Sequence, residues 1–437
     1  MIWCTRTAHT LRKAPTPLSR HFSFSFRARF PRQTRSLSDV HPPARSSIPS
    51  FREQVARASP VKSFTDAVRY PGVRGHILFF LGASLFAYGV AAQNTNVETD
   101  FWTKYLSGQF RWTTSAPSTG DMRLARQTVT LKKVQAQLNQ LTDYLANAPI
   151  MIKSVVLHTY ARVAEEYLNA SEGRRAAWGI CAVNVVVWAA WQIPRLRPFM
   201  QIHFTHNPLS GKTYTMLTSM FSHASFLHLL FNCMALTSFA SASSTWMTRE
   251  QNHAPSRRQE ATATYHFLGF YLSAGLFSSL VSHVVATRFL YPRLVSRLAQ
   301  SPPGAPGKLS SISASLTSAA KAPALAAAPA AAEAVAPANA ILPSLGASGA
   351  IYGAVVLSAI AFPDAEVSLV FPPTPSFPIQ YGVGGMVLLD CVGALRGWRI
   401  FDHYAHLGGA VFGGLYYTYG IQWWDSLRTG LSKPARS

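Results

Sequence analysis

Three polar residues that lie in otherwise apolar stretches could do chemistry together: Ser348, Asn232 and His406. A serine becomes an effective nucleophile when a base such as histidine takes its proton, and the tetrahedral intermediate then needs hydrogen-bond donors. An asparagine amide and a backbone N–H can supply them, each worth about 3–4 kcal/mol of transition-state stabilisation. We therefore expect the three side chains to converge, although a lone serine in a membrane helix can also bond back to its own turn.

Glycines accompany both the serine and the histidine. Gly349 and Gly353 lie four residues apart, on one face of the helix expected there, and Gly409 and Gly413 repeat the spacing in the histidine segment. Small residues at this spacing let the backbones of two membrane helices approach closely. The pattern predicts a close contact that brings the serine and the histidine within hydrogen-bond reach.

The composition is that of a membrane protein. Of 437 residues, 48% are hydrophobic and only 13% are charged, and several long apolar runs carry no charge. Much of the formal net charge of +22 precedes the first apolar run, so it indicates targeting and topology rather than nucleic-acid binding. The four cysteines show no C-x-x-C or zinc spacing, and we expect neither disulfide nor metal nor organic cofactor.

Seven apolar segments predict membrane spans, one ahead of the other six. They lie at 75–93, 176–193, about 213–241, 265–289, from 346 onward, 378–395 and 402–421. We predict an all-α polytopic membrane protein with a six-helix core, residues 176–424, and one extra N-terminal transmembrane helix, residues 75–93. Residues 425–437 are expected to form a C-terminal tail.

Three further segments lie outside the predicted spans. Residues 1–74 are basic, rich in serine and poor in acids, which is typical of a mitochondrial transit peptide or of a disordered basic tail. Residues 94–175 form a polar connector, and apolar residues at helical spacing within 122–168 predict an amphipathic helix on the membrane or the bundle, or a solvated connector. Residues 301–343, mostly alanine, proline and serine, predict a disordered insertion.

Three short motifs together resemble one known family. They are Gly346-Ala347-Ser348-Gly349, Ala405-His406-Leu407-Gly408-Gly409, and Phe221-Ser222-His223 with His228-Leu229-Leu230-Phe231-Asn232. Their order and their placement on separate spans are similar to the signatures of the rhomboid intramembrane serine proteases. The extra span, the leader and the run from Phe401 to His406 resemble the mitochondrial, presenilin-associated rhomboid-like branch. The resemblance covers roughly residues 176–424.

The resemblance implies a role for each matching residue. Ser348 would be the nucleophile and His406 the general base of a dyad without a third carboxylate. Asn232 and His228, one helical turn apart, would line the oxyanion site with the backbone N–H of the serine. Tyr352 would pack against the catalytic histidine, although its residue type alone fits an ordinary packing aromatic. Gly346 and Gly349 would support the serine.

The resemblance also implies a location and a substrate class. The protein would lie in the mitochondrial inner membrane and cleave single-span transmembrane proteins within the lipid bilayer. By resemblance, substrates would include a mitochondrial dynamin-like GTPase and presequence-anchored proteins of the intermembrane space. Extended backbone is needed at the nucleophile, so substrate helices should be weakened locally by glycine, proline or polar residues.

Four other polar residues near the motifs have structural interpretations. Asp402 is expected to cap the helix that carries the histidine, because aspartate favours the first turn of a helix. Asp390 is expected to be a capped or paired polar group inside its span. His223 and His403 are expected to be exposed or to snorkel toward the interface.

Other protein classes fit the sequence less well. The serine motif lacks the second glycine of G-x-S-x-G and follows no strand, which excludes an α/β-hydrolase. No H-E-x-x-H motif is present for an intramembrane metalloprotease, and the paired repeats of a transporter are not evident. The serious alternative is a catalytically silent protein of the same fold that binds transmembrane clients without cleaving them.

Overall fold

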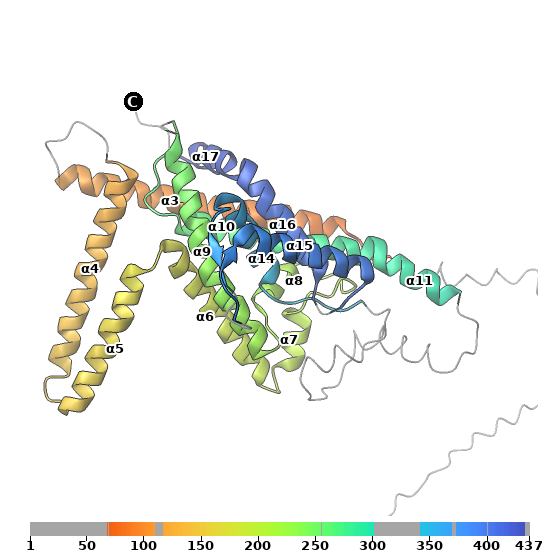
Figure 1. The fold of residues 1–437 in the computed structure, drawn as a ribbon, viewed down its shortest axis with the longest axis horizontal. Helices are drawn as coiled ribbons and strands as arrows, with labels where there is room; N and C mark the ends of the chain where they lie inside the picture. The colour runs from red at the N-terminus through yellow and green to blue at the C-terminus, as the bar shows by residue number, and fades with distance from the viewer. Residues whose placement is uncertain are drawn as a thin grey trace, which may run out of the picture. The chain divides into compact units, whose positions relative to one another are not determined.

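The computed structural model describes the chain in seven ranges: 68, 70–109, 117–254, 256–300, 341–368, 373–399 and 401–432. Nearly all of the predicted leader (1–74) and most of the predicted insertion (301–343) lie outside these ranges. Both therefore stay predictions. Figure 1 shows the arrangement of the described elements.

Helices occupy all seven places at which the sequence predicts a span. They are α3 (Arg74–Gln109), α6 (Glu172–Gln192), α9 (Phe226–His253), α10 (Thr264–Val285), α14 (Ser348–Ala361), α15 (Ile379–Arg396) and α16 (His403–Leu415). By length and hydropathy, three described helical segments could cross a membrane, and α14 is a shorter apolar helix; the three are Arg74–Gly108, Phe226–His253 and Thr264–Arg297. The predicted all-α polytopic fold class is confirmed.

Shorter elements connect these helices. Two π-helical turns continue α10 into α11 and α16 into α17. The remaining described elements are α4 (Thr119–Tyr144), α5 (Ile150–Asn169), α7 (Arg197–His203), α8 (Thr215–Thr218), the 3-10 turn Ser219–Phe221, α11 (Tyr291–Ala299), α17 (Ile421–Gly430), and the antiparallel pair β1 (Glu366–Val367) and β2 (Phe377–Pro378).

The third predicted span begins later than expected, at Phe226 and not near residue 213. The preceding residues form α8 and a 3-10 turn. Ser225 ends that irregular stretch because its side-chain oxygen accepts the backbone N–H of His228 at 3.2 Å and caps α9. This cap places His228 and Asn232 in the first turns of α9.

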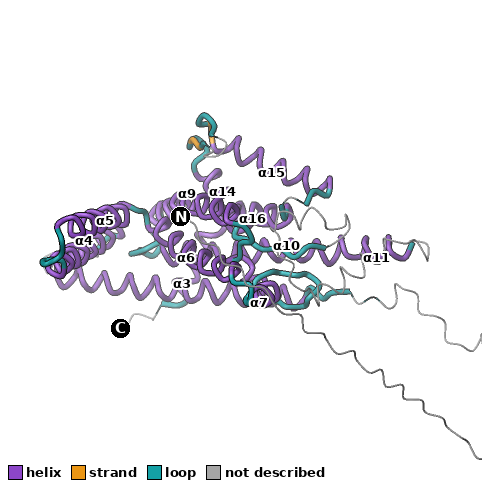
Figure 2. Tube along the Cα trace, turned by 90° about the horizontal axis from the view of Figure 1, so that it is seen from below, coloured by secondary structure: helices purple, strands orange, loops and turns teal. Residues whose placement is uncertain are grey.

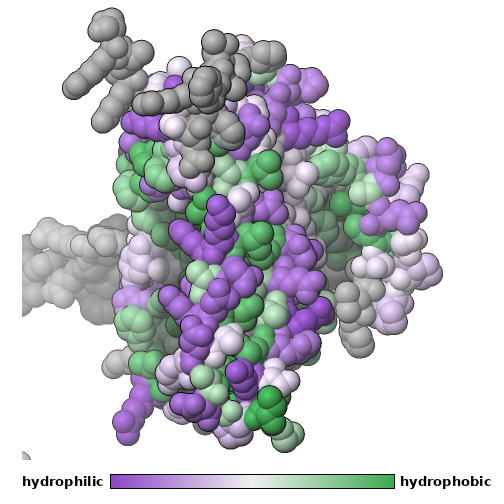
Figure 3. Space-filling view, turned by 90° about the vertical axis from the view of Figure 1, so that its left-hand side faces the viewer, coloured by the Kyte–Doolittle hydropathy of each residue, from purple (hydrophilic) through white to green (hydrophobic). Residues whose placement is uncertain are grey.

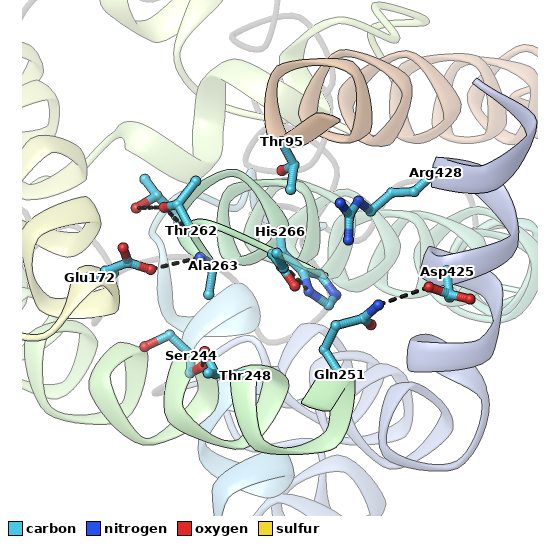
Figure 4. A network of polar contacts seen from close by, with 12 residues as sticks. Thr95, Glu172, Ser244, Thr248, Gln251, Thr262, Ala263, His266, Asp425 and Arg428 are labelled. Carbon is cyan, nitrogen blue, oxygen red and sulfur yellow. Dashed lines mark hydrogen bonds and ion pairs between the residues drawn. The ribbon is translucent and has the colours of Figure 1, made fainter. Parts of the chain in front are cut away.

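The first and last helices are longer than predicted and meet through buried polar groups. Arg428 is fully buried; its guanidinium donates to Asn96 Oδ1 at 3.0 Å and to the Gln259 carbonyl at 2.7 Å. Nearby, the amide of Gln251 at the end of α9 donates to Asp425 at 2.8 Å (Figure 4). Since a buried charge needs such partners, this network fixes α3, α9 and α17 together at the end of α9 farthest from His228.

The helices α14 and α16 touch along their backbones. A Cβ atom on Gly409 would lie 2.1 Å from the carbonyl oxygen of Gly349, and one on Gly413 would lie 2.3 Å from that of Gly353. The close approach predicted from the glycine spacing is confirmed. The helix α10 packs against both helices, and its Phe267 and Phe270 belong to the buried core that they share.

The predicted amphipathic connector forms a hairpin of two helices, α4 and α5, which lie side by side in Figures 1 and 2. Tyr160 of α5 donates to the Val134 carbonyl of α4 at 3.2 Å. Only the start of α4 enters the core, where Met122 packs with Trp102 of α3. Figure 3 looks onto this side of the molecule and shows hydrophilic and hydrophobic side chains interleaved. The connector is therefore neither one helix nor laid along the bundle.

Substituting Gly409 tests the helix contact. We expect Gly409→Ala to destabilise the protein by roughly 1–3 kcal/mol, because the new methyl group overlaps a backbone oxygen that cannot swing aside. Gly414→Ala is the matched control on the same helix, since no atom lies within 4 Å of a Cβ built there. Thermal unfolding in detergent micelles measures both; equal stability of the two variants would contradict the tight packing.

Candidate active site

Ser348 is the first residue of α14 and is partly exposed. The segment ahead of it is held by backbone hydrogen bonds. Gly346 N–H donates to the Ser219 carbonyl at 2.9 Å, and Ser344 exchanges two backbone hydrogen bonds with His206, at 2.9 and 3.0 Å. Because these bonds fix the approach to the helix, the serine hydroxyl has a defined position.

The histidine predicted to be the base lies directly against the serine. Nε2 of His406 is 2.9 Å from Oγ of Ser348. The start of α16 is fixed by Asp402, which accepts the Ala405 N–H at 3.0 Å and the Ser282 hydroxyl at 2.7 Å. The predicted capping role of Asp402 is confirmed. The expected convergence of the serine and the histidine is present in the structure.

A carboxylate lies on the far side of the histidine ring. Nδ1 of His406 is 3.2 Å from Oδ1 of Asp390, a residue of α15 that is 2% exposed. The expectation of a pair without a third carboxylate is wrong, whereas the expectation that Asp390 is a paired polar group is confirmed. An acid inside an apolar span was the signal that could have pointed to this residue.

Two further groups hold the carboxylate. The hydroxyl of Tyr352 donates to Oδ2 of Asp390, and Nδ1 of His403 lies 2.6 Å from Oδ1. His403 is therefore buried, at 3% exposure, and the expectation that it is exposed or snorkels is wrong. The ring of Tyr352 also stacks on that of His406, with centroids 4.8 Å apart and planes at 11°. This stacking fits the role that the family resemblance implies for Tyr352, which is to pack against His406, better than it fits an ordinary packing aromatic.

The geometry defines the protonation pattern that the chemistry needs. With its Nδ1–H donated to Asp390, the ring of His406 presents the lone pair of Nε2 to the hydroxyl of Ser348. A buried carboxylate that accepts three hydrogen bonds is stabilised in its ionised form. The arrangement can therefore take a proton from the serine and stabilise the resulting imidazolium.

Of the predicted oxyanion residues, His228 contacts the segment that precedes the serine, and Asn232 lies one turn further along α9. The ring of His228 lies against Gly346, where an added Cβ would be 2.8 Å from its Cε1. The side-chain nitrogen of Asn232 donates to the carbonyl of His228 at 2.7 Å, so the amide is engaged within its own helix. The N–H of Ser348 belongs to the first turn of α14, where backbone donors have no intrahelical partner.

His223 also has a defined place, which the sequence reasoning missed. It is fully buried, and its Nε2 accepts the backbone N–H of Ala347 at 3.4 Å. Its ring lies edge-on to that of His228, with centroids 5.0 Å apart. The expectation that His223 is exposed or snorkels is wrong, because the ring supports the residue directly before the serine. Its place within the Phe221–His223 motif was the available signal.

A small cavity of about 40 Å³ adjoins the serine. Its walls include Ser219, Gly346, Ser348 and Asp402. A space of this size and polarity is enough for one or two water molecules. The site therefore has room for the second reactant of a hydrolysis.

The comparisons with known proteins point to one family. A rhomboid domain matches residues 210–291 and 307–423. The chain is 30% identical over 302 residues to presenilin-associated rhomboid-like protein A, mitochondrial, of Danio rerio, an alignment that covers 66% of this chain and 60% of the relative. It is 30% identical over 273 residues to presenilin-associated rhomboid-like protein, mitochondrial, of Homo sapiens, covering 60% and 55%.

A more distant relative is rhomboid protein 1, mitochondrial, of Saccharomyces cerevisiae, 26% identical over 284 residues that cover 64% of this chain and 60% of the relative. The chain thus spans between 55% and 60% of the length of these three relatives. No solved structure matches the chain.

Substituting Gly346 tests how the serine is positioned. Its φ of 125° is disfavoured for residues with a Cβ, and that Cβ would also meet the ring of His228. We expect Gly346→Ala to destabilise the protein by about 1–3 kcal/mol. Gly384→Ala on α15, where a Cβ meets nothing within 4 Å, should not. Thermal unfolding in detergent compares them, and an unaffected Gly346→Ala would show that the segment adapts freely.

Proposed function

The chain belongs to the rhomboid family, and we propose that this multi-pass protein of the mitochondrial inner membrane is an intramembrane serine endopeptidase. The observation that carries the proposal is the 2.9 Å contact between Oγ of Ser348 and Nε2 of His406, with Asp390 behind the histidine. A serine that only packs helices would donate its hydroxyl to a carbonyl of its own helical turn. Ser348 of α14 instead faces the ring of His406 on α16.

The proposed reaction is acyl transfer in two halves. Nε2 of His406 takes the proton of the Ser348 hydroxyl as Oγ bonds to the scissile carbonyl carbon. The imidazolium then gives that proton to the leaving amine nitrogen as the C–N bond breaks, which leaves an acyl-enzyme. A water molecule, deprotonated by the same histidine, attacks the ester and restores the serine hydroxyl. Asp390 keeps the ring in its reactive tautomer and offsets its transient charge.

The oxyanion would be held by the N–H of Ser348 together with Asn232 and His228. The amide nitrogen of Asn232 carries two N–H donors, so one can keep its 2.7 Å hydrogen bond to the His228 carbonyl while the other donates to the oxyanion. Each donor that reaches the oxyanion would contribute about 3–4 kcal/mol to transition-state stabilisation. Substrate entry would then complete a site whose nucleophile and base are already paired.

The proposed substrates are single-span transmembrane proteins presented within the lipid bilayer. By resemblance they would include a mitochondrial dynamin-like GTPase and presequence-anchored proteins of the intermembrane space. Cleavage needs locally extended backbone, so we propose that the cut falls where glycine, proline or polar residues weaken the substrate helix.

Removing the nucleophile or the base should abolish cleavage. We expect Ser348→Ala and His406→Ala each to lower turnover of a panel of single-span substrates by at least about 10³-fold, because the two groups act as a unit. Matched controls are Ser238→Ala and His158→Ala, at exposed positions on α9 and α5. Gel-based cleavage in detergent and in liposomes measures turnover, and thermal unfolding confirms that each variant is folded.

Two results would count against the proposal. Cleavage by Ser348→Ala at the wild-type rate would show that another residue is the nucleophile. Wild-type protein that captures the spans without cutting any of them would instead favour the client-binding alternative.

Replacing Asp390 tests whether its carboxylate contributes to turnover beyond the contribution of Ser348 and His406. Asp390→Asn keeps the size of the side chain but loses the charge that fixes the histidine tautomer, so kcat should fall by roughly 10²–10⁴-fold with little change in KM. Asp364→Asn, exposed in the loop after α14, is the control. Steady-state kinetics on one cleaved substrate gives both constants; an unchanged kcat would mean that Asp390 only packs the helices.

A further inference from the structure

Three buried histidines from distant parts of the chain meet near the start of α3. His76 comes from α3, His206 from the loop after α7, and His283 from α10. Their exposed fractions are 2%, 0% and 0%. The sequence predicted no metal site, because its residues are 130 and 77 positions apart and form no short motif.

The ring nitrogens of these histidines have a spacing close to that of metal ligands. One nitrogen from each lies within 4.8 Å of the others, and Nε2 of His206 is 3.1 Å from Nδ1 of His283. Zinc–nitrogen bonds of about 2.0–2.1 Å at tetrahedral angles place ligand nitrogens about 3.3 Å apart. One pair already has this separation, and the third ligand must move inward by an ångström or two.

The hydrogen bonds around His206 place its lone pair on the nitrogen that faces the cluster, where it accepts from Nδ1–H of His283 at 3.1 Å until an ion replaces that proton. The hydroxyl of Thr215 donates its one proton to the Lys212 carbonyl at 2.7 Å, so it must accept from Nδ1–H of His206 at 2.9 Å. The lone pair of His206 is therefore on Nε2, which faces the cluster.

Two of the three histidines carry ring nitrogens without a hydrogen-bond partner of normal geometry. Within the part of the chain that the structure describes, neither ring nitrogen of His76 nor Nε2 of His283 makes a hydrogen bond of normal geometry, although the backbone of Gly72 lies close to both rings and that of Lys212 close to His76. A buried polar atom without a good hydrogen bond destabilises the folded protein, and such groups call for an explanation. The ring of His76 now stacks on that of His283, with centroids 3.6 Å apart, and a turn about its side-chain torsions would aim a nitrogen at the centre.

We propose that His76, His206 and His283 bind a divalent late transition-metal ion, with Zn²⁺ as the ion that three imidazoles and one open position suit best. Three neutral nitrogens are the donor set that zinc, copper and nickel prefer over calcium or magnesium. Thr215 serves as the outer partner that orients His206, as carbonyls and hydroxyls do around metal-bound histidines.

The site would connect the extra N-terminal helix to the serine segment. His206 pairs through its backbone with Ser344, four residues before Ser348, while His76 lies at the start of α3. The ion would therefore fix α3, α10 and the loop that supports the approach to the serine. This proposal concerns metal binding and does not depend on protease activity.

The test is metal binding by the full-length protein purified in detergent. After removal of metals by a chelator, wild type should bind one Zn²⁺ per chain by isothermal titration and mass spectrometry of metals. Bound Co²⁺ should show the intense visible bands of tetrahedral nitrogen coordination. Zinc should also raise the unfolding temperature of the wild type, since an ion that binds only the folded state stabilises it.

Variants separate this site from surface binding. His76→Gln and His283→Gln should weaken Zn²⁺ binding by at least about 100-fold, and Thr215→Val, which keeps all three ligands, by about 10–100-fold. His158→Gln, an exposed histidine of α5, should bind as the wild type does. Zinc binding that persists unchanged in His76→Gln and Thr215→Val, or no zinc binding by folded wild type, would overturn the proposal.

Discussion

The contact between the backbones of α14 and α16 is the constraint on which the site depends. A methyl group on Gly409 would overlap the carbonyl oxygen of Gly349, so only glycine allows this separation. At that separation the hydroxyl of Ser348 and Nε2 of His406 reach 2.9 Å. In a membrane, where apolar burial gives no net attraction between helices, such packing is a principal source of helix association. The same contact thus holds the two helices together and brings the serine and the histidine within hydrogen-bond distance.

A second constraint is the carboxylate of Asp390 inside the bundle. An ionised group at this depth is tolerated only with hydrogen-bond donors around it, and Tyr352, His403 and His406 each provide one. These donors come from both α14 and α16, so the acid on α15 locks the two helices in register. His406 is consequently held on three sides: by the serine, by the acid and by the stacked tyrosine ring.

Much of this arrangement could be predicted from the sequence, and the failures have physical reasons. Glycine spacing and apolar runs are local patterns, so the helices and the contact between Ser348 and His406 followed from them. The roles of Asp390 and His223 depend on which neighbours a tertiary fold brings near. The start of the third span was placed too early because the residues before Ser225 mix apolar with polar side chains and form only the short helix α8 and a 3-10 turn.

Covalent labelling of the protein by a fluorophosphonate, with the adduct located by mass spectrometry, measures whether Ser348 is an activated nucleophile. A serine activated through the helix contact should give one adduct, on Ser348, in wild type and in Gly414→Ala. Labelling of Gly409→Ala, which retains every side chain of the site, should be roughly 100-fold slower, because an ångström of misplacement has that effect on reactivity. Equal labelling of folded Gly409→Ala, or an adduct on another residue, would contradict the account.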